Sequence, residues 1–135
     1  MVTVPTAVAR VTRAGTRAMC FGAVREARSL HLYANDAEPG DDGGRLREVA
    51  GGGYAPVSLA VEDWTLRDAP GQVVATYPER VWRFTDAVGA VYGYYVAGAG
   101  GTVLWAERFR PDALLVRGPG DEIRLTLELA LEHPA

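Results

Sequence analysis

The sequence of 135 residues has no lysine, a single cysteine and only two serines. Its one thiol, Cys20, can form no disulfide within the chain and cannot build a thiolate metal cluster. No apolar run approaches the ~20 residues that cross a bilayer. The segment Met1 to Arg10 also lacks the charged-then-apolar order of a secretion signal. These absences predict no membrane partner. A single cysteine does not indicate whether the protein belongs to an oxidising or a reducing compartment.

The 14 basic residues are all arginine, and they are unevenly distributed. Residues 1–28 hold five arginines against one acid, whereas residues 29–135 hold nine arginines against sixteen acids. A basic segment on an acidic body predicts that the segment contacts a negatively charged partner. The alternative is that these arginines only keep a solvent-facing segment soluble. The candidate partner-binding residues are Arg10, Arg13, Arg17, Arg25 and Arg28. The acidic body argues against a nucleic-acid partner.

Residues 1–28 are interpreted as an N-terminal arm, and residues 29–135 as one β domain. Pro5 breaks the start of the arm, and Gly15 and Gly22 are expected to interrupt it further. A helix could form there only in pieces, for example over 7–14 or 23–29. The sequence therefore predicts either one short helix or an arm that is ordered by packing onto something else. Cys20, between Met19 and Phe21, is interpreted as a small buried apolar residue.

From residue 29 onward, short apolar–polar alternations are separated by glycine and proline turns. Expected strands cover about 30–34, 46–49, 57–66, 73–77, 81–85, 91–97, 102–109 and 122–132. No helical crossover is visible between them, which argues against a parallel α/β sheet. The sequence predicts an all-β protein, an antiparallel β-sandwich or jelly roll of about eight strands.

The last expected strand has the clearest pattern. In "EIRLTLELALE", residues 122–132, one side is apolar throughout and the other is mostly charged or polar. Leucine and glutamate favour helices, but period two along the whole segment indicates a half-buried strand. Burial of five apolar side chains, at roughly 1.5–3 kcal/mol each, outweighs propensity differences of tenths of a kcal/mol.

The densest aromatic stretch is expected to form a β-hairpin whose tip is Gly98–Gly101. Gly93 lies between Tyr92 and Tyr94, where either a close neighbour or a β-bulge would favour a residue without a side chain. The hairpin is expected to build the core. A platform that stacks on carbohydrate or on bases is the alternative.

The sequence offers few candidates for chemistry. His31 is expected at the surface or at a sheet edge, and it has no partner at metal-ligand spacing. Ser29 and Ser58 lie outside any G-x-S-x-G turn, and no Ser/His/Asp set suggests itself. The acidic loop 36–42 lacks the order of an EF-hand, which leaves a solvated loop or an irregular calcium site open. No catalytic residue, cofactor or metal site is predicted.

Four segments together resemble a group of small virion structural proteins of tailed bacteriophages. They are a Leu-x-Leu-Tyr-x-Asn opening, a Gly-Tyr dipeptide ahead of a strand ending in Trp, a Tyr-Gly-Tyr hairpin leading to Glu-Arg-Phe, and a closing strand after Gly-Asp. The matching positions are Leu30, Leu32, Tyr33, Asn35, Gly53, Tyr54, Trp64, Tyr92, Gly93, Tyr94, Glu107, Arg108, Phe109, Gly120 and Asp121. The resemblance covers residues 29–131. The chain departs from the group at Gly51–Gly53, where an acidic and aromatic stretch is commoner.

The resemblance implies a non-enzymatic virion protein, assembled in the host bacterial cytoplasm. The implied role is that of a capsid decoration or cement protein that binds and stabilises the shell of major capsid protein. Its partners would be the major capsid protein or other virion proteins, and it would form a homo-oligomer, a dimer or trimer. One alternative is a tail, fibre or baseplate component that binds host carbohydrate through loops 35–44 and 98–101. Another is a small jelly-roll enzyme, which would need acids and His31 in one cleft.

Overall fold

The computed structural model describes residues 9–134. In this part the chain forms one α-helix and eleven β-strands. The helix is α1 (Arg13–Glu26), and two short 3-10 turns cover Val61–Asp63 and Ala99–Gly101. The strands are β1 (Ser29–Tyr33), β2 (Val57–Ser58), β3 (Thr65–Ala69), β4 (Gln72–Thr76), β5 (Arg80–Arg83), β6 (Gly89–Val91), β7 (Gly93–Ala97), β8 (Val103–Arg108), β9 (Leu114–Val116), β10 (Glu122–Leu125) and β11 (Glu128–Glu132). None of the described segments is a helix of the length and apolar character needed to cross a membrane.

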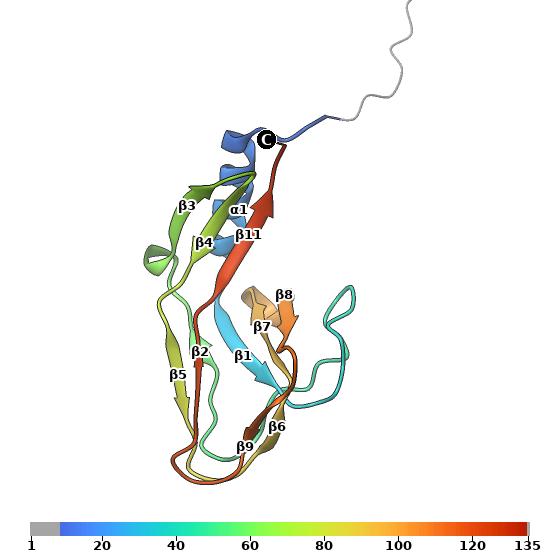
Figure 1. The fold of residues 1–135 in the computed structure, drawn as a ribbon, viewed down its shortest axis with the longest axis vertical. Coiled ribbons are helices and arrows are strands. Elements are labelled where there is room, and N and C mark those ends of the chain that lie inside the picture. The colour runs from blue at the N-terminus through green and yellow to red at the C-terminus, as the bar shows by residue number, and fades with distance from the viewer. Residues whose placement is uncertain (1–8, 135) are drawn as a thin grey trace, which may run out of the picture.

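All strand pairs are antiparallel, so the predicted antiparallel, mostly β character is confirmed. The largest sheet has the order β2-β1-β7-β8, and a second has the order β11-β4-β3. Two further pairs, β10-β5 and β6-β9, extend the molecule. Figure 1 shows β3, β4, β5 and β11 along one side of an elongated body, and β1, β7 and β8 along the other.

Three expected strands are divided in the structure, because each passes from one sheet to another. The segment 91–97 is interrupted at Tyr92, where β6 pairs with β9 and β7 pairs with β1 and β8. The segment 57–66 is interrupted by the 3-10 turn Val61–Asp63. The segment 122–132 divides into β10, which pairs with β5, and β11, which pairs with β4. With β9, which the sequence did not predict, these divisions explain why the described chain has more than eight strands.

The alternation of residues 122–132 continues through this division. Ile123 and Leu127 are buried, Leu125, Leu129 and Leu131 are partly buried, and the intervening residues are exposed. Leu127 lies between the two strands, and its carbonyl accepts a hydrogen bond of 3.0 Å from the Tyr77 N–H. The predicted strand pattern with one buried side is therefore confirmed, although the segment contributes strands to two sheets. In contrast, the expected strand 46–49 is reduced to a single bridge between Glu48 and Tyr33.

The predicted interruption of the N-terminal segment at Gly15 and Gly22 is wrong, because α1 runs through both positions. The helix begins where the Thr12 hydroxyl accepts a hydrogen bond of 3.1 Å from the Gly15 N–H, an N-cap interaction. The helix buries Thr16, Cys20 and Val24, a narrow stripe with a spacing of four residues. Helix α1 lies against β4 and β11, as Figure 1 shows. Of the expected 7–14 piece, residues 9–12 precede the helix and residues 13 and 14 belong to it, whereas residues 7 and 8, like Pro5, lie outside the described residues.

The core lies between the largest sheet and the strands that face it. Leu30, Leu32 and Val96 contribute from the largest sheet and are fully buried. From the facing side, Trp64, which lies just before β3, contacts the ring of Trp105 on β8 at 6.0 Å between centroids. The hairpin of β7 and β8 thus builds core, as expected, and its tip is the predicted Gly98–Gly101 turn.

Candidate functional site

The predicted partner-binding arginines lie mostly on one side of α1. Arg13, Arg17 and Arg25 recur at multiples of four residues, with Phe21 between them, so they follow one ridge along the helix. Arg28 follows the helix and returns to it, since its guanidinium donates a 2.7 Å hydrogen bond to the Arg25 carbonyl. All five side chains are exposed, and we call this set, Arg13, Arg17, Phe21, Arg25 and Arg28, the arginine ridge. Arg10 is also exposed but lies in the segment before the helix.

The contacts of the arginine ridge are weak. Arg17 forms an ion pair with Asp68 of β3 at 3.5 Å, with both side chains about half exposed. The Arg25 guanidinium lies 5.7 Å from the centroid of the Phe21 ring, a cation–π contact. Exposed ion pairs contribute about 0–1 kcal/mol, so the ridge can exchange them for a partner at little cost. Phe21, 48% exposed, adds an apolar centre to this basic surface.

A shallow hollow adjoins the arginine ridge where α1 meets β3. Its volume is about 480 Å³, and it is lined by Ala14, Arg17, Ala18, Phe21 and Leu66. Small residues at 14 and 18 leave the Phe21 ring accessible from the side. An apolar side chain of a partner could therefore enter beside the ring while arginines bind carboxylates around it.

A second cluster, on the outer face of the largest sheet, is polar and was not predicted. The Ser29 hydroxyl is 2.7 Å from His31 Nε2, and His31 Nδ1 is 2.6 Å from a carboxylate oxygen, Oε2, of Glu48. The Tyr54 hydroxyl donates to the same Glu48 oxygen at 2.6 Å. We call Ser29, His31, Glu48 and Tyr54 the serine–histidine cluster.

Two expectations about these residues are wrong. His31 is not at a sheet edge, since β1 lies between β2 and β7, and its side chain is only 15% exposed, with the imidazole stacked on the Tyr95 ring at 4.6 Å. A serine, a histidine and an acid also do converge. Ser29 and His31 share a strand face because they are two residues apart, a signal that the sequence contains. Glu48 reaches them only through its bridge to β1 across a long loop, which no local pattern shows.

Two tyrosines at this site, Tyr54 of the cluster and Tyr95 stacked on His31, have raised pKa values. Burial, and then the hydrogen bond to Glu48, raise the pKa of Tyr54 well above its ordinary value. Burial also raises the pKa of Tyr95, with a smaller contribution from the Glu48 charge. The Tyr54 hydroxyl also accepts a 3.0 Å hydrogen bond from the Leu32 N–H. Glu48 is thus held by a tyrosine that is itself fixed to the β1 backbone.

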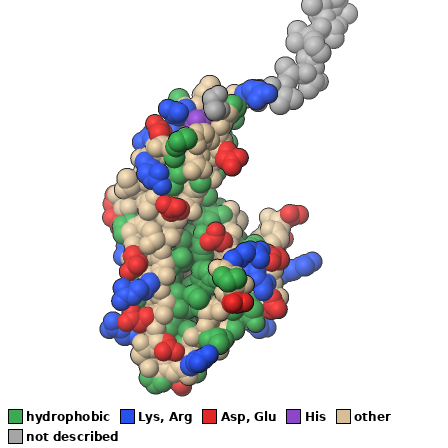
Figure 2. Space-filling view, viewed as in Figure 1, with side chains coloured by type: hydrophobic (Ala, Val, Ile, Leu, Met, Phe, Trp, Pro, Cys, Tyr) green, Lys and Arg blue, Asp and Glu red, His purple; other side chains and the backbone are tan. Residues whose placement is uncertain are grey.

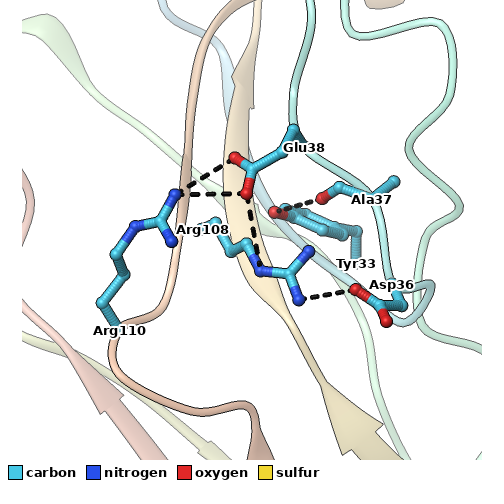
Figure 3. A network of polar contacts seen from close by, with 6 residues as sticks. All are labelled: Tyr33, Asp36, Ala37, Glu38, Arg108 and Arg110. Carbon is cyan, nitrogen blue, oxygen red and sulfur yellow. Dashed lines mark hydrogen bonds and ion pairs between the residues drawn. The ribbon is translucent and has the colours of Figure 1, made fainter.

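The acidic loop closes onto β8 through the ion pairs shown in Figure 3. Arg108 contacts Asp36 and Glu38, and Arg110 contacts both carboxylate oxygens of Glu38 at 3.2 Å. Beneath them the buried Tyr33 donates its hydroxyl proton to the Ala37 carbonyl at 3.2 Å. Two of the loop acids are therefore neutralised by arginine. Within residues 9–134 no group of three or more His, Cys, Asp or Glu side chains is arranged to hold a metal ion.

The surface of the molecule carries apolar side chains beside unpaired strand edges. Figure 2 shows apolar side chains gathered between the two flanks of the body. A groove of about 520 Å³ is lined by three apolar residues, Phe109, Leu114 and Leu125, and by five charged residues, Glu107, Arg108, Arg110, Asp112 and Arg124. Strand β8 is an edge of the largest sheet, and β10 and β11 are edges of theirs. Unpaired strand edges beside apolar side chains are typical of surfaces that pair with another chain.

Comparisons of the chain with protein-family models, with curated proteins and with solved structures find no match.

Proposed function

We propose that the protein is a structural component of a bacteriophage virion, a capsid decoration or cement protein that binds the shell of major capsid protein. The observation that carries this proposal is the arginine ridge. It places a row of exposed guanidinium groups around an exposed phenylalanine on a helix that is packed onto its own sheets. The acidic remainder of the chain and the resemblance of residues 29–131 to tailed-phage virion proteins support the same role.

The ridge has the composition of a binding hot spot. Arginine and aromatic residues are enriched where truncation costs most, and a stable interface buries about 800 Å² on each partner. The guanidinium groups would bind carboxylates of a capsid surface, and Phe21 would enter an apolar depression among them. Because α1 is already folded against β4 and β11, little conformational entropy is lost on binding.

We further propose that the sheets form an open β-sandwich related to the jelly roll, and that the protein is a dimer or trimer. The ring contact between Trp64 and Trp105 supports two facing layers. The groove beside the edge strand β8 supports oligomerisation, since pairing of edges between copies would cover its apolar residues.

Co-sedimentation with empty shells of the major capsid protein encoded in the same genome tests the proposed function. Deletion of residues 1–28 is a poor variant, because it would uncover the core beneath α1. Charge reversal of the ridge, Arg13→Glu with Arg17→Glu and Arg25→Glu, leaves the buried stripe intact. The matched control, Arg45→Glu with Arg47→Glu and Arg117→Glu, makes the same change of charge at exposed arginines elsewhere.

We expect the wild type and the control to bind the shells saturably, and the ridge variant to lose binding. Binding of the wild type should also weaken as salt is raised, since exposed charges are screened. Equal binding of both variants would show that the arginine ridge is not part of the interface. No binding of the wild type would contradict the capsid role and favour the alternative, a tail, fibre or baseplate component that binds host carbohydrate.

A further inference from the structure

The serine–histidine cluster has the arrangement of an activated nucleophile. The order is hydroxyl, imidazole and carboxylate, with 2.7 Å between Ser29 Oγ and His31 Nε2 and 2.6 Å between His31 Nδ1 and Glu48 Oε2. An ionised carboxylate can only accept hydrogen bonds, so in the contact with Glu48 the proton is on His31 Nδ1. When the imidazole is neutral, the lone pair of Nε2 is then free to accept the proton of the serine hydroxyl. Nucleophile, base and orienting acid at hydrogen-bond distance are the signature of covalent catalysis.

The imidazole is held in this orientation from several sides. It stacks on Tyr95 of β7 with 4.6 Å between centroids and 4° between planes. Glu48 is held by the Tyr54 hydroxyl, which is bonded to the Leu32 N–H of the same strand. Ser29 and His31 both belong to an interior strand, which is a more precise support than a loop. The base is therefore positioned before any substrate arrives.

The surroundings of Ser29 restrict what can react there. Ser29 is partly exposed, and its neighbours across the two flanking strands are the small residues Ala97 and Ser58. Ala97 is buried and Ser58 is exposed, so the side of Ser58 is the one from which a small group can approach the hydroxyl. The Glu48 charge disfavours anionic substrates. Esters with a good leaving group need the least stabilisation of the developing oxyanion, so these are the substrates that we expect to react.

We infer that Ser29 is a covalent acyl-accepting site for small, uncharged, activated esters, with His31 as its general base and Glu48 as the residue that orients His31. Ser29 Oγ attacks the carbonyl carbon, and its proton moves to His31 Nε2. The intermediate expels the alcohol or phenol, which takes that proton, and the acyl group remains on Ser29. Water, deprotonated by His31, then releases the acid and restores the hydroxyl. This activity goes beyond the proposed structural role and does not depend on it.

The probe is p-nitrophenyl acetate, with acetylation of the full-length protein located by mass spectrometry. The chain suits this experiment because it has no lysine to compete for the ester and only one other serine. Ser58 lies opposite Ser29 on the same face and has no histidine contact among the described residues, so it is an internal control. General-base assistance typically contributes 10²–10⁴-fold, and we expect Ser29 to be acetylated on the order of 100-fold faster than Ser58.

Variants distinguish activation of Ser29 by His31 from acetylation that is fast only because the serine is exposed. Ser29→Ala should abolish the fast acetylation, and His31→Gln should slow it to the level of Ser58. Glu48→Gln should slow it as well and keeps the test valid if His31→Gln fails to fold, which circular dichroism will show. Equal slow acetylation of both serines in the wild type would overturn the inference. Fast hydrolysis that persists in Ser29→Ala would overturn it too, since another group would then be the nucleophile.

Discussion

Gly93 shows how a single position can be constrained by its neighbours. A Cβ placed there would lie 2.3 Å from the Glu107 carbonyl oxygen and 2.5 Å from Cε1 of the buried Tyr33. Neither the β8 backbone nor a ring under the acidic loop can move aside easily. The sequence predicted either this crowding or a β-bulge because the glycine lies between two strand tyrosines, and the structure confirms the crowding.

Gly93→Ala should therefore lower the free energy of unfolding by about 1–3 kcal/mol, the cost of overpacking. Urea denaturation measures the change. Gly118→Ala is the matched control, because a Cβ there meets no atom within 4 Å and the backbone does not have a positive φ. Equal stability of the two variants would show that β7 and β8 can separate to admit a methyl group.

Buried tyrosines make the stability depend on alkaline pH. Burial and the Glu48 contact raise the pKa of Tyr54 above its ordinary 10.0, and burial raises the pKa of Tyr94 likewise. Above about pH 10 the unfolded chain loses these protons while the folded chain keeps them. The folded state then binds more protons, so the free energy of unfolding falls as the pH rises past that value. Below it this contribution is constant.

Tyr54→Phe tests this dependence. The variant should be less stable at neutral pH by about 1 kcal/mol, because the Leu32 N–H and Glu48 lose a partner. Its stability should then fall less steeply than that of the wild type above about pH 10, since one titrating group is gone. Urea midpoints across this range measure both effects. Identical slopes would exclude Tyr54 as a source of the alkaline loss.

Helix α1 contains a glycine, Gly22, that has no neighbour close enough to exclude a larger side chain. A Cβ at Gly22 would meet no atom within 4 Å, and the residue lies in the middle of the helix. Gly22→Ala should stabilise the protein by about 0.8–1 kcal/mol, the difference in helix propensity between the two residues. A rise in the thermal midpoint checks this, with the exposed Ala18→Gly as the reverse control. A lower midpoint for Gly22→Ala would contradict the absence of contacts.

The elements differ in how well the sequence predicted them. Residues 122–132 were predicted as a one-sided strand because period two needs only local alternation. The passage to a second sheet at Leu127 was not predictable, since it depends on partners in β4 and β5. For α1, the two glycines suggested interruption, but packing of three buried side chains outweighed their propensity cost. Local alternation shows which face of a strand is buried, whereas pairing between distant segments decides which sheet the strand joins.

At the scale of the whole molecule, the groove and its unpaired edges support the proposed oligomer. Leu114 is 41% exposed on β9 and lines the groove. Leu114→Lys should convert a dimer or trimer to monomers in sedimentation velocity, because a charge would be buried in the interface. The variant should remain folded, since the side chain is largely outside the core. A monomeric wild type would contradict the proposed oligomer, and an unchanged oligomer in the variant would place the interface elsewhere.

The single thiol lies beneath α1, so the rate at which it reacts reports how often the helix separates from the sheets. Cys20 is fully buried on the face by which the helix docks, and burial raises its pKa. A thiol reagent can reach it only when α1 lifts from the sheets or the whole chain unfolds. The labelling rate, relative to that of the unfolded chain, therefore gives the free energy of this opening. If labelling needs less free energy than global unfolding, the surface that carries the arginines can detach on its own.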